Sequence, residues 1–199
     1  MRYSATLLGL IAFCFLLQLL IPGLTEALYF EPSKVFSEPW RWISSMFLHG
    51  GFMHIFLNGF ALLMFGPIVE RKLSASQFLA LYFASGIAGS LFYYLSIVAG
   101  IIPPIPALGA SGAIYGILGA AAVLFPDMVV YTYFVPLRMR YAAILWAFLA
   151  LIGSFDAGSG IASAAHLGGL VVGYLMAKHY KSKEDDLIYF YQEIPPEVL

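Results

Sequence analysis

The sequence predicts an all-α, polytopic membrane protein with six transmembrane helices, and three observations carry this prediction. The chain of 199 residues is 61% hydrophobic and only 11% charged, with a mean hydropathy of +0.87. Soluble domains carry about 25% charged residues, so a water-soluble protein of this size could not bury so much apolar surface. The charged residues fall in clusters separated by long apolar gaps. Proline and glycine residues divide those gaps into segments near the roughly 20 residues that a membrane-spanning helix needs.

Each charge-free gap predicts one or two helices. The first gap gives a span that ends at Pro22-Gly23, and the second gives a span that begins after Gly50-Gly51. The third gap is too long for one helix, and the prolines within Pro103–Pro106 divide it in two. The last two gaps give one span each. The six predicted helices are Ala5–Ile21, His54–Val69, Gln77–Ala99, Ser111–Phe125, Tyr141–Ser154 and Ala162–Lys178.

The distribution of Lys and Arg predicts the orientation in the cell membrane. Six spans place both ends of the chain on one side, which then holds eight of the 10 basic residues, against Lys34 and Arg41 on the other. Basic residues favour the cytoplasm, so we expect both termini there. Residues 1–180 then form one membrane domain, and residues 181–199 form a short cytoplasmic tail. A cleaved signal peptide at residues 1–21 is the alternative, but no A-x-A-like cleavage site follows it.

Composition also limits the class of partner. The net charge of −1 argues against a nucleic-acid binder that works by bulk charge. Cys14 is the single cysteine, which excludes an internal disulfide and a metal site built from cysteines. We therefore expect the lipid bilayer as a partner, no nucleic acid or nucleotide, and no cofactor or metal.

Ser111 is the first residue with a candidate chemical role. It lies directly after the proline-rich turn, in the sequence Gly109-Ala110-Ser111-Gly112, where the fourth span begins. The start of a helix presents free backbone N–H groups and the positive end of the helix dipole, which suits a developing oxyanion. Serine also favours helix N-caps for structural reasons, so its position alone does not decide between the two roles.

His166 is the second candidate, because polar groups at membrane depth are expensive and tend to be functional. Gly169 and Gly173 form a G-x-x-x-G face on the same span, which lets another helix backbone approach closely. The fourth span has a face of small residues too, so the two spans can pack together and bring His166 to Ser111. Serine beside histidine is the arrangement of a nucleophile and its base. A histidine that only bonds a backbone carbonyl is the structural alternative.

Further polar side chains lie at and within the second and fourth spans. His54 and Asn58 are four residues apart, so they share a helix face and can both donate to an anionic oxygen. His49 precedes them in the sequence that leads into the second span. A metal pair is the alternative, although asparagine is a poor zinc ligand and no H-E-x-x-H occurs. Tyr115 is four residues after Ser111 and lies one turn deeper on the same helix face. A tyrosine there can serve the site, or it can simply pack in the core.

Taken together, these residues resemble the rhomboid family of intramembrane serine proteases, in its minimal six-span prokaryotic form. The W-R pair of the family's first loop matches Trp40-Arg41, and the pattern H-x-x-x-x-H-x-x-x-N matches His49, His54 and Asn58. Two more patterns, G-x-S-G-x-x-Y and A-H-x-x-G-x-x-x-G, match Gly109, Ser111, Gly112, Tyr115, Ala165, His166, Gly169 and Gly173. Each pattern alone is weak, but all four occur in order on the expected spans.

The resemblance implies that Ser111 is the nucleophile and His166 the general base. It also implies an oxyanion hole formed by His54, Asn58 and the Ser111 backbone N–H, with Tyr115 stacked on His166. The implied activity is hydrolysis of a peptide bond in or near the transmembrane segment of a single-span protein. The implied site opens to the extracytoplasmic side.

Two acidic residues qualify this resemblance. The family often has G-x-x-x-E-x-x-x-G at the end of the second span, whereas here Gly66 and Glu70 are followed by Ser74. Asp156 is on the same side of the membrane as the candidate site, but it lies in the loop before the sixth span. It would have to shed its hydration to reach His166, which is costly, so we expect a Ser-His dyad without a catalytic carboxylate.

Two other functions are rivals. The first is a catalytically inactive rhomboid-like protein that binds membrane proteins without cutting them, which the presence of both Ser111 and His166 disfavours. The second is a small transporter or channel. A transporter would predict a pathway lined by charged residues, yet no charged residue lies within the middle of a predicted span.

Overall fold

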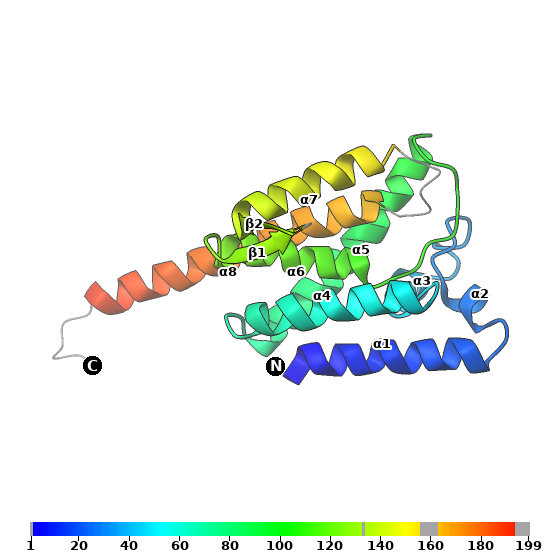
Figure 1. Cartoon of the computed structure of the whole chain (residues 1–199), viewed down its shortest axis with the longest axis horizontal. Helices are drawn as coiled ribbons and strands as arrows, with labels where there is room; N and C mark the ends of the chain where they lie inside the picture. The colour runs from blue at the N-terminus through cyan, green and yellow to red at the C-terminus, as the bar shows by residue number, and fades with distance from the viewer. Residues whose placement is uncertain (1, 133, 156–162, 194–199) are drawn as a thin grey trace.

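The computed structural model describes residues 2–132, 134–155 and 163–193, with side chains described as far as residue 182. Long helices form a bundle, and the first loop with its short helices gathers at one end of it (Figure 1). In chain order the elements are α1 (Arg2–Leu20), α2 (Leu24–Leu28), α3 (Arg41–Ser44), the 3₁₀ turn η1 (Ser45–Phe47), α4 (Phe52–Glu70), α5 (Ala75–Val98), α6 (Ser111–Leu124), β1 (Val129–Thr132), β2 (Val135–Arg138), α7 (Met139–Gly153) and α8 (Ser163–Glu193).

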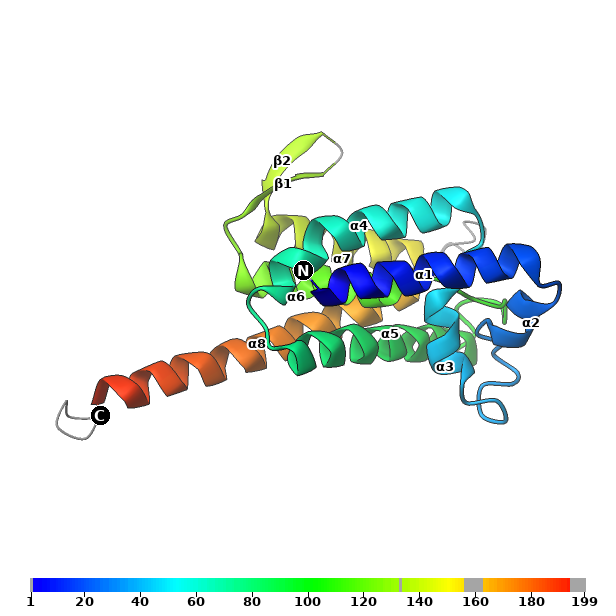
Figure 2. The same cartoon turned by 90° about the horizontal axis from the view of Figure 1, so that it is seen from below.

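Helix α6 is the centre of the bundle. It packs against α4, α5, α7 and α8 (Figures 1 and 2). Ten of its 14 residues are buried, and most of these are glycine or alanine. Such small side chains let the surrounding helices approach the α6 backbone closely. The residue at the start of α6 is therefore held by neighbours on several sides.

The long helices lie where the apolar gaps predict them, and the chain is a mostly helical membrane protein. Within the residues that the structure describes, three helices, α1, α4 and α5, are long and apolar enough to cross a bilayer by length and composition. Helices α6 and α7 are apolar but shorter, with 14 and 15 residues. Helix α8 continues past Lys178, the predicted end of the sixth span, to Glu193. The count of six spans and the boundary between residues 180 and 181 stay predictions.

Several short elements were not predicted. The first loop contains α2, α3 and η1, and a two-stranded antiparallel hairpin, β1–β2, joins α6 to α7. An all-α description therefore misses a small amount of strand. The reason is physical: four-residue elements are too short to show a hydrophobic period, so the sequence does not distinguish the hairpin strands from an ordinary loop between two helices.

Glu70 and Ser74 explain the departure from the family's pattern after the second span. The Glu70 carboxylate accepts hydrogen bonds from the backbone N–H groups of Tyr3 and Ser4 at 2.9 and 3.0 Å, and from the Ser4 hydroxyl at 2.6 Å. It thereby caps the start of α1 from the end of α4. Ser74 caps α5, because its hydroxyl accepts from the Gln77 N–H within a capping box. Serine thus has a structural role where the pattern has glycine.

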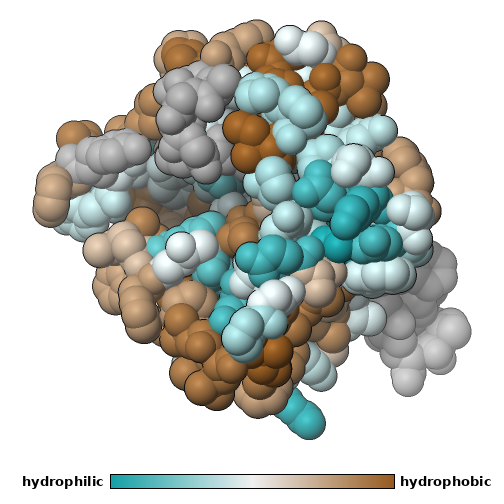
Figure 3. Space-filling model, turned by 90° about the vertical axis from the view of Figure 1, so that its right-hand side faces the viewer, coloured by the Kyte–Doolittle hydropathy of each residue, from teal (hydrophilic) through white to brown (hydrophobic). Residues whose placement is uncertain are grey.

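The first loop forms a small core with the end of α5, built from Phe30 and Val35 of the loop and Tyr93 of α5, with Trp42 packed against it. Arg41 is buried beside this core, where its Nε donates to Glu38 Oε2 at 2.6 Å and its Nη1 donates to backbone carbonyls of α2 and the residues that follow. Figure 3 faces this end of the molecule and shows hydrophilic residues gathered over its middle, with hydrophobic residues at its margins. A polar end bordered by apolar sides suits a bundle that meets water there.

Candidate active site

Ser111 and His166 are brought together by the packing of α6 on α8. The Ser111 Oγ lies 2.8 Å from His166 Nε2, although the two residues are 55 positions apart in the chain. Ser111 is the first residue of α6, and His166 lies in the first turn of α8. A serine hydroxyl at this distance from an imidazole nitrogen can pass its proton to the ring.

Glycines make this approach possible. A Cβ added at Gly169 would overlap the carbonyl oxygen of Gly112, and a Cβ added at Gly173 would overlap that of Gly116. The two helix backbones are therefore in direct contact along the G-x-x-x-G face of α8. Any side chain at either position would push α8 away from α6 and would separate His166 from Ser111.

Tyr115 lies one turn along α6 from Ser111 and stacks on His166. The two ring centroids are 4.3 Å apart and the rings are parallel to within 3°. A flat contact of this kind restricts rotation of the imidazole ring about its side-chain torsions. Tyr115 thus holds the ring in the orientation that points Nε2 towards Ser111, without supplying a charge.

His54 lies beside the segment that leads into Ser111. The Gly50 backbone N–H donates to His54 Nδ1 at 3.3 Å, which makes Nδ1 the acceptor and leaves the ring proton on Nε2. Gly109 packs against the other edge of the ring, because a Cβ there would lie 2.8 Å from both Cε1 and Nε2. Gly109 also has a φ of +132°, which side chains rarely adopt. The proton-bearing nitrogen of His54 therefore faces the turn before Ser111.

Asn58 lies one turn after His54 on α4 and is buried. Its side-chain amide donates to the His54 backbone carbonyl at 3.0 Å, which uses one of its two N–H bonds within its own helix. The other N–H is the one that remains for a substrate oxygen. Among the described residues, no three His, Cys, Asp or Glu side chains come close enough together to hold a metal ion.

His49 is a packing partner of His54. The two imidazole rings meet edge to face, with centroids 5.0 Å apart, and the His49 side chain is buried. Burial, and to a smaller extent the nearby His54, lower the pKa of His49 from its ordinary value of 6.5 to about 4. His49 is therefore neutral at physiological pH and supports the His54 ring by contact.

A large cavity opens over these residues. Its volume is about 840 Å³, which is large enough for a peptide segment, and it is bordered mainly by apolar side chains. Its polar lining includes His54, Asn58, Ser111, Tyr115 and His166, together with Tyr93, Ser154 and Ser163. All the predicted catalytic side chains thus line one space, which continues between α4 and α7.

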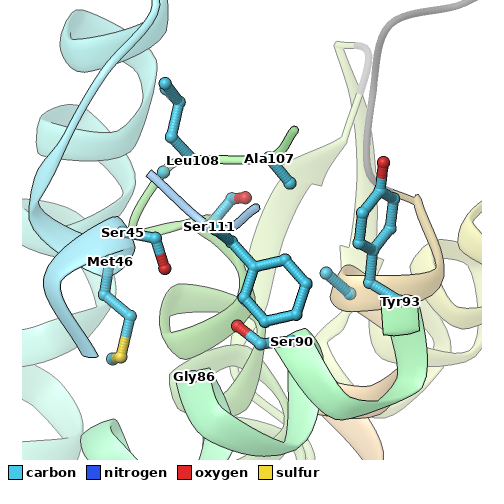
Figure 4. A pocket seen from close by; sticks show the side chains of 12 residues that line it. Ser45, Met46, Gly86, Ser90, Tyr93, Ala107, Leu108 and Ser111 are labelled. Carbon is cyan, nitrogen blue, oxygen red and sulfur yellow. The ribbon is translucent and has the colours of Figure 1, made fainter. Parts of the chain in front are cut away.

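A second, much smaller cavity of about 30 Å³ is also lined by Ser111. The hydroxyl groups of Ser45 and Ser90 point into it, while Tyr93 and Met46 close its sides (Figure 4). A space of this volume with hydroxyl groups in its wall fits about one water molecule. Ser111 therefore borders both a substrate-sized cavity and a water-sized one.

Comparison with known proteins agrees with these features. A family model described as the Rhomboid domain matches residues 37–182. The chain belongs to the rhomboid family. Similar relatives are Rhomboid protein 1, mitochondrial, of Saccharomyces cerevisiae (40% identical over 148 residues), Rhomboid protease GluP of Bacillus subtilis (36% over 140) and RHOMBOID-like protein 5 of Arabidopsis thaliana (31% over 142). These alignments cover 67%, 70% and 70% of this chain, but 39%, 26% and 43% of the relatives' own length. One of these relatives, GluP, is named as a protease.

Two positioning contacts of this rhomboid chain were missed from the sequence. Gln18 on α1 accepts from the His49 backbone N–H at 2.9 Å and donates to the His49 carbonyl at 3.2 Å, so it clamps the segment that enters α4. Phe30 and Ala107 exchange two backbone hydrogen bonds of 2.9 Å, which tie the first loop to the segment before Ser111. An amide inside an apolar span was the signal for Gln18. The pairing of Phe30 with Ala107 has no such signal.

The remaining residues that the sequence singled out differ in burial and in their location in the rhomboid structure. Trp40 is half exposed at the start of α3, and Arg41 is buried in the first loop, away from the dyad. Gly112 lies at the contact between α6 and α8, where a Cβ would have ordinary contacts. Asp156 lies outside the described residues.

Proposed function

We propose that this chain is an intramembrane serine endopeptidase that cuts single-span membrane proteins in or near their transmembrane segment. The observation that carries the proposal is the distance of 2.8 Å between Ser111 Oγ and His166 Nε2 at the wall of a substrate-sized cavity. A nucleophile and a base at hydrogen-bonding distance are what acyl transfer to serine needs. Family membership supports the same reading.

Acylation uses the dyad twice. As Ser111 Oγ bonds to the carbon of the scissile peptide carbonyl, His166 Nε2 accepts the hydroxyl proton. The carbonyl oxygen becomes an anion, which the Ser111 backbone N–H and the Nε2–H of His54 stabilise, with Asn58 as a further donor. The protonated His166 then gives its proton to the leaving amine as the C–N bond breaks. The product is an ester between Ser111 and the substrate acyl group.

Deacylation needs one water molecule at the same carbon. His166 takes a proton from this water while its oxygen bonds to the acyl carbon. The ester bond to Ser111 then breaks, and His166 returns the proton to Oγ, so the enzyme is restored and a carboxylic acid leaves. The small cavity beside Ser111 is the place from which that water comes.

The site is proposed to open to the extracytoplasmic side of the cell membrane, with six spans and both termini in the cytoplasm. Helix α6 begins at Ser111 and has 14 residues, or about 21 Å at about 1.5 Å per residue. The hydrocarbon core is about 30 Å thick, so Ser111 lies below the outer surface. The polar end of the molecule in Figure 3 is the side from which water enters.

One experiment separates this proposal from its rivals. The purified chain is incubated in detergent or in liposomes with a model single-span substrate, beside the variant Ser111→Ala. We expect cleavage by the parent chain and none by the variant, with both equally folded. Substrate binding without cleavage by the parent would indicate an inactive rhomboid-like binder. Cleavage by Ser111→Ala at the parental rate would refute the serine mechanism.

A further inference from the structure

The β1–β2 hairpin lies at the end of the bundle opposite the candidate site. Ser111 begins α6 at the site, and the hairpin follows the other end of α6. This is also the end where Glu70 caps the start of α1. In Figure 2 the hairpin stands out from the side of the bundle, next to the ends of α4 and α7, rather than continuing along the helix axes. By the proposed orientation, it lies at the level of the cytoplasmic membrane surface.

The two faces of the hairpin differ. Residues paired across the strands point to the same face, and the registers are Val130 with Leu137 and Thr132 with Val135 on one face. Thr132 is buried and Val130 packs on the main core, so the β1 side of this face is turned to the bundle, whereas Val135 of β2 is 54% exposed. The opposite face is exposed and mainly apolar. Its residues are Val129, Tyr131, Pro136 and Arg138.

The tip of the hairpin carries Phe134, the most exposed apolar residue among those that the structure describes. Phe134 is 98% exposed, and Tyr131 is 77% exposed. Phe134 also has a φ of +68°, a region where glycine and asparagine are at ease and a bulky side chain is a genuine outlier. A turn that needs only its backbone geometry would be more stable with Asn or Gly. A phenylalanine at such a position indicates a use for its side chain.

Lipid is the occupant that fits this surface. The exposed apolar residues continue onto the lipid-facing side of α7, where Tyr141 and Ile144 are exposed as well. Aromatic side chains favour the boundary between lipid headgroups and acyl chains. Two arginines, Arg138 and Arg140, share one acidic partner, Asp127, so the base of the hairpin has a net positive charge. A cytoplasmic leaflet that contains anionic lipids attracts such a charge.

The unpaired edges of the two strands determine how deep the hairpin can lie in the bilayer. In the described part of the chain the sheet has two strands, so each strand has an outer edge of backbone N–H and C=O groups. Such edges are not found bare in the hydrocarbon core, because no water satisfies them there. They are satisfied among headgroups and interfacial water. The strands therefore lie at headgroup level, with the tip directed to the acyl boundary.

We propose that the β1–β2 hairpin is an interfacial anchor that binds anionic phospholipid headgroups of the cytoplasmic leaflet. Phe134 and Tyr131 enter the interface, and Arg138 and Arg140 contact the phosphate groups. The hairpin joins α6 to α7, so its anchoring fixes the height of both helices in the bilayer. This role does not depend on the proteolytic activity of the chain.

Spin labelling tests the proposal. Cys14→Ala removes the chain's one cysteine, and Val135→Cys then places a nitroxide next to the tip. Label positions Phe148→Cys on the exposed face of α7 and Lys181→Cys on α8 serve as lipid and water references. The protein is studied in liposomes of phosphatidylcholine with phosphatidylglycerol. The readout is the accessibility of each label to oxygen and to a water-soluble nickel complex.

We expect the label at position 135 to be less accessible to the nickel complex than the label at 181, and less accessible to oxygen than the label at 148. Phe134→Asn suits the left-handed turn. Adding it should shift the oxygen and nickel accessibilities of the label at 135 towards those of the label at 181, while thermal stability is kept. In liposomes of phosphatidylcholine alone, the nickel accessibility at 135 should rise.

Three results would overturn the anchor. Values at 135 equal to those at 181 would place the hairpin in water. Values equal to those at 148 would place it in the hydrocarbon core. Dipolar broadening that disappears on dilution with unlabelled protein would show that a second copy of the chain covers the surface instead of lipid.

Discussion

Gly109→Ala tests how the turn before Ser111 holds the candidate oxyanion hole. The added Cβ would lie 2.8 Å from His54 Cε1 and Nε2, whereas ordinary contacts begin at 3.4 Å, so the ring must move by about 0.6 Å or the turn must shift. A hydrogen bond to an oxyanion needs about 2.7–3.1 Å, so a displacement of this size loses it. Loss of one such donor typically costs about 10²–10³ in kcat. The left-handed φ adds about 1–3 kcal/mol of strain, which a lower Tm would report.

A double-mutant cycle distinguishes this explanation from a general disturbance. His54→Ala should itself cost about 10²–10³ in kcat. If Gly109→Ala acts through the His54 ring, the double variant should lose about the same 10²–10³, and not the product of about 10⁴–10⁶ expected for independent sites. The matched control is Gly50→Ala. Its Cβ would lie 3.7 Å from His54 Nδ1, an ordinary contact, so near-parental cleavage of a single-span substrate is expected. Fully multiplicative losses, or parental activity of Gly109→Ala, would refute the reasoning.

Four further predictions concern single side chains. Ser111→Ala should abolish cleavage and labelling by a fluorophosphonate while Tm stays close to the parental value, because only a hydroxyl group is lost; labelling of the variant would contradict this. Tyr115→Ala should lower kcat strongly, and Tyr115→Phe, which keeps the ring stacked on His166, should lose less; equal losses would argue against stacking. Asp156→Ala should keep most activity in the same cleavage assay, whereas a loss as deep as that of His166→Ala would require a triad. The pKa of His49 is about 4 in the folded chain and 6.5 ordinarily. Between these two pH values the unfolded chain binds a proton that the folded chain does not. The free energy of unfolding therefore falls by up to about 3 kcal/mol as the pH drops from about 6.5 towards 4. Thermal unfolding across this range checks the fall, and His49→Gln should flatten it.

The parts of the fold that sequence could predict are those that the bilayer dictates. Lipid cannot satisfy backbone groups, so each apolar gap must be helical, and prolines and glycines mark where helices end. The contact between α6 and α8 follows in the same way from Gly169 and Gly173, since a helix face without side chains lets another helix backbone approach closely in a membrane. That packing is what places His166 next to Ser111 in the structure.

The parts that sequence could not predict depend on single long-range contacts. Phe30 pairs with Ala107 across 77 positions of chain through backbone atoms, and backbone pairing of this kind leaves no mark on residue type. The hairpin strands have four residues each, which is too few for a period of two to be distinguished from a loop. The extension of α8 to Glu193 was missed because charge was read as the end of the helix, whereas charge ends only the apolar part of it.

The first loop takes part in the geometry of the dyad, although none of its residues touches Ser111 Oγ or His166 Nε2 in the described hydrogen bonds. Phe30 fixes the backbone of Ala107, four residues before Ser111, and its small core also packs against Ala165, the residue before His166. Both halves of the dyad are therefore positioned from one cluster. A change that loosens this cluster should alter the distance between the serine oxygen and the imidazole nitrogen before it unfolds the bundle, because α6 and α8 stay in contact through their glycines. We expect a change at the buried Arg41 to alter this distance by the same route, since its bonds to backbone carbonyls hold the loop that carries Phe30.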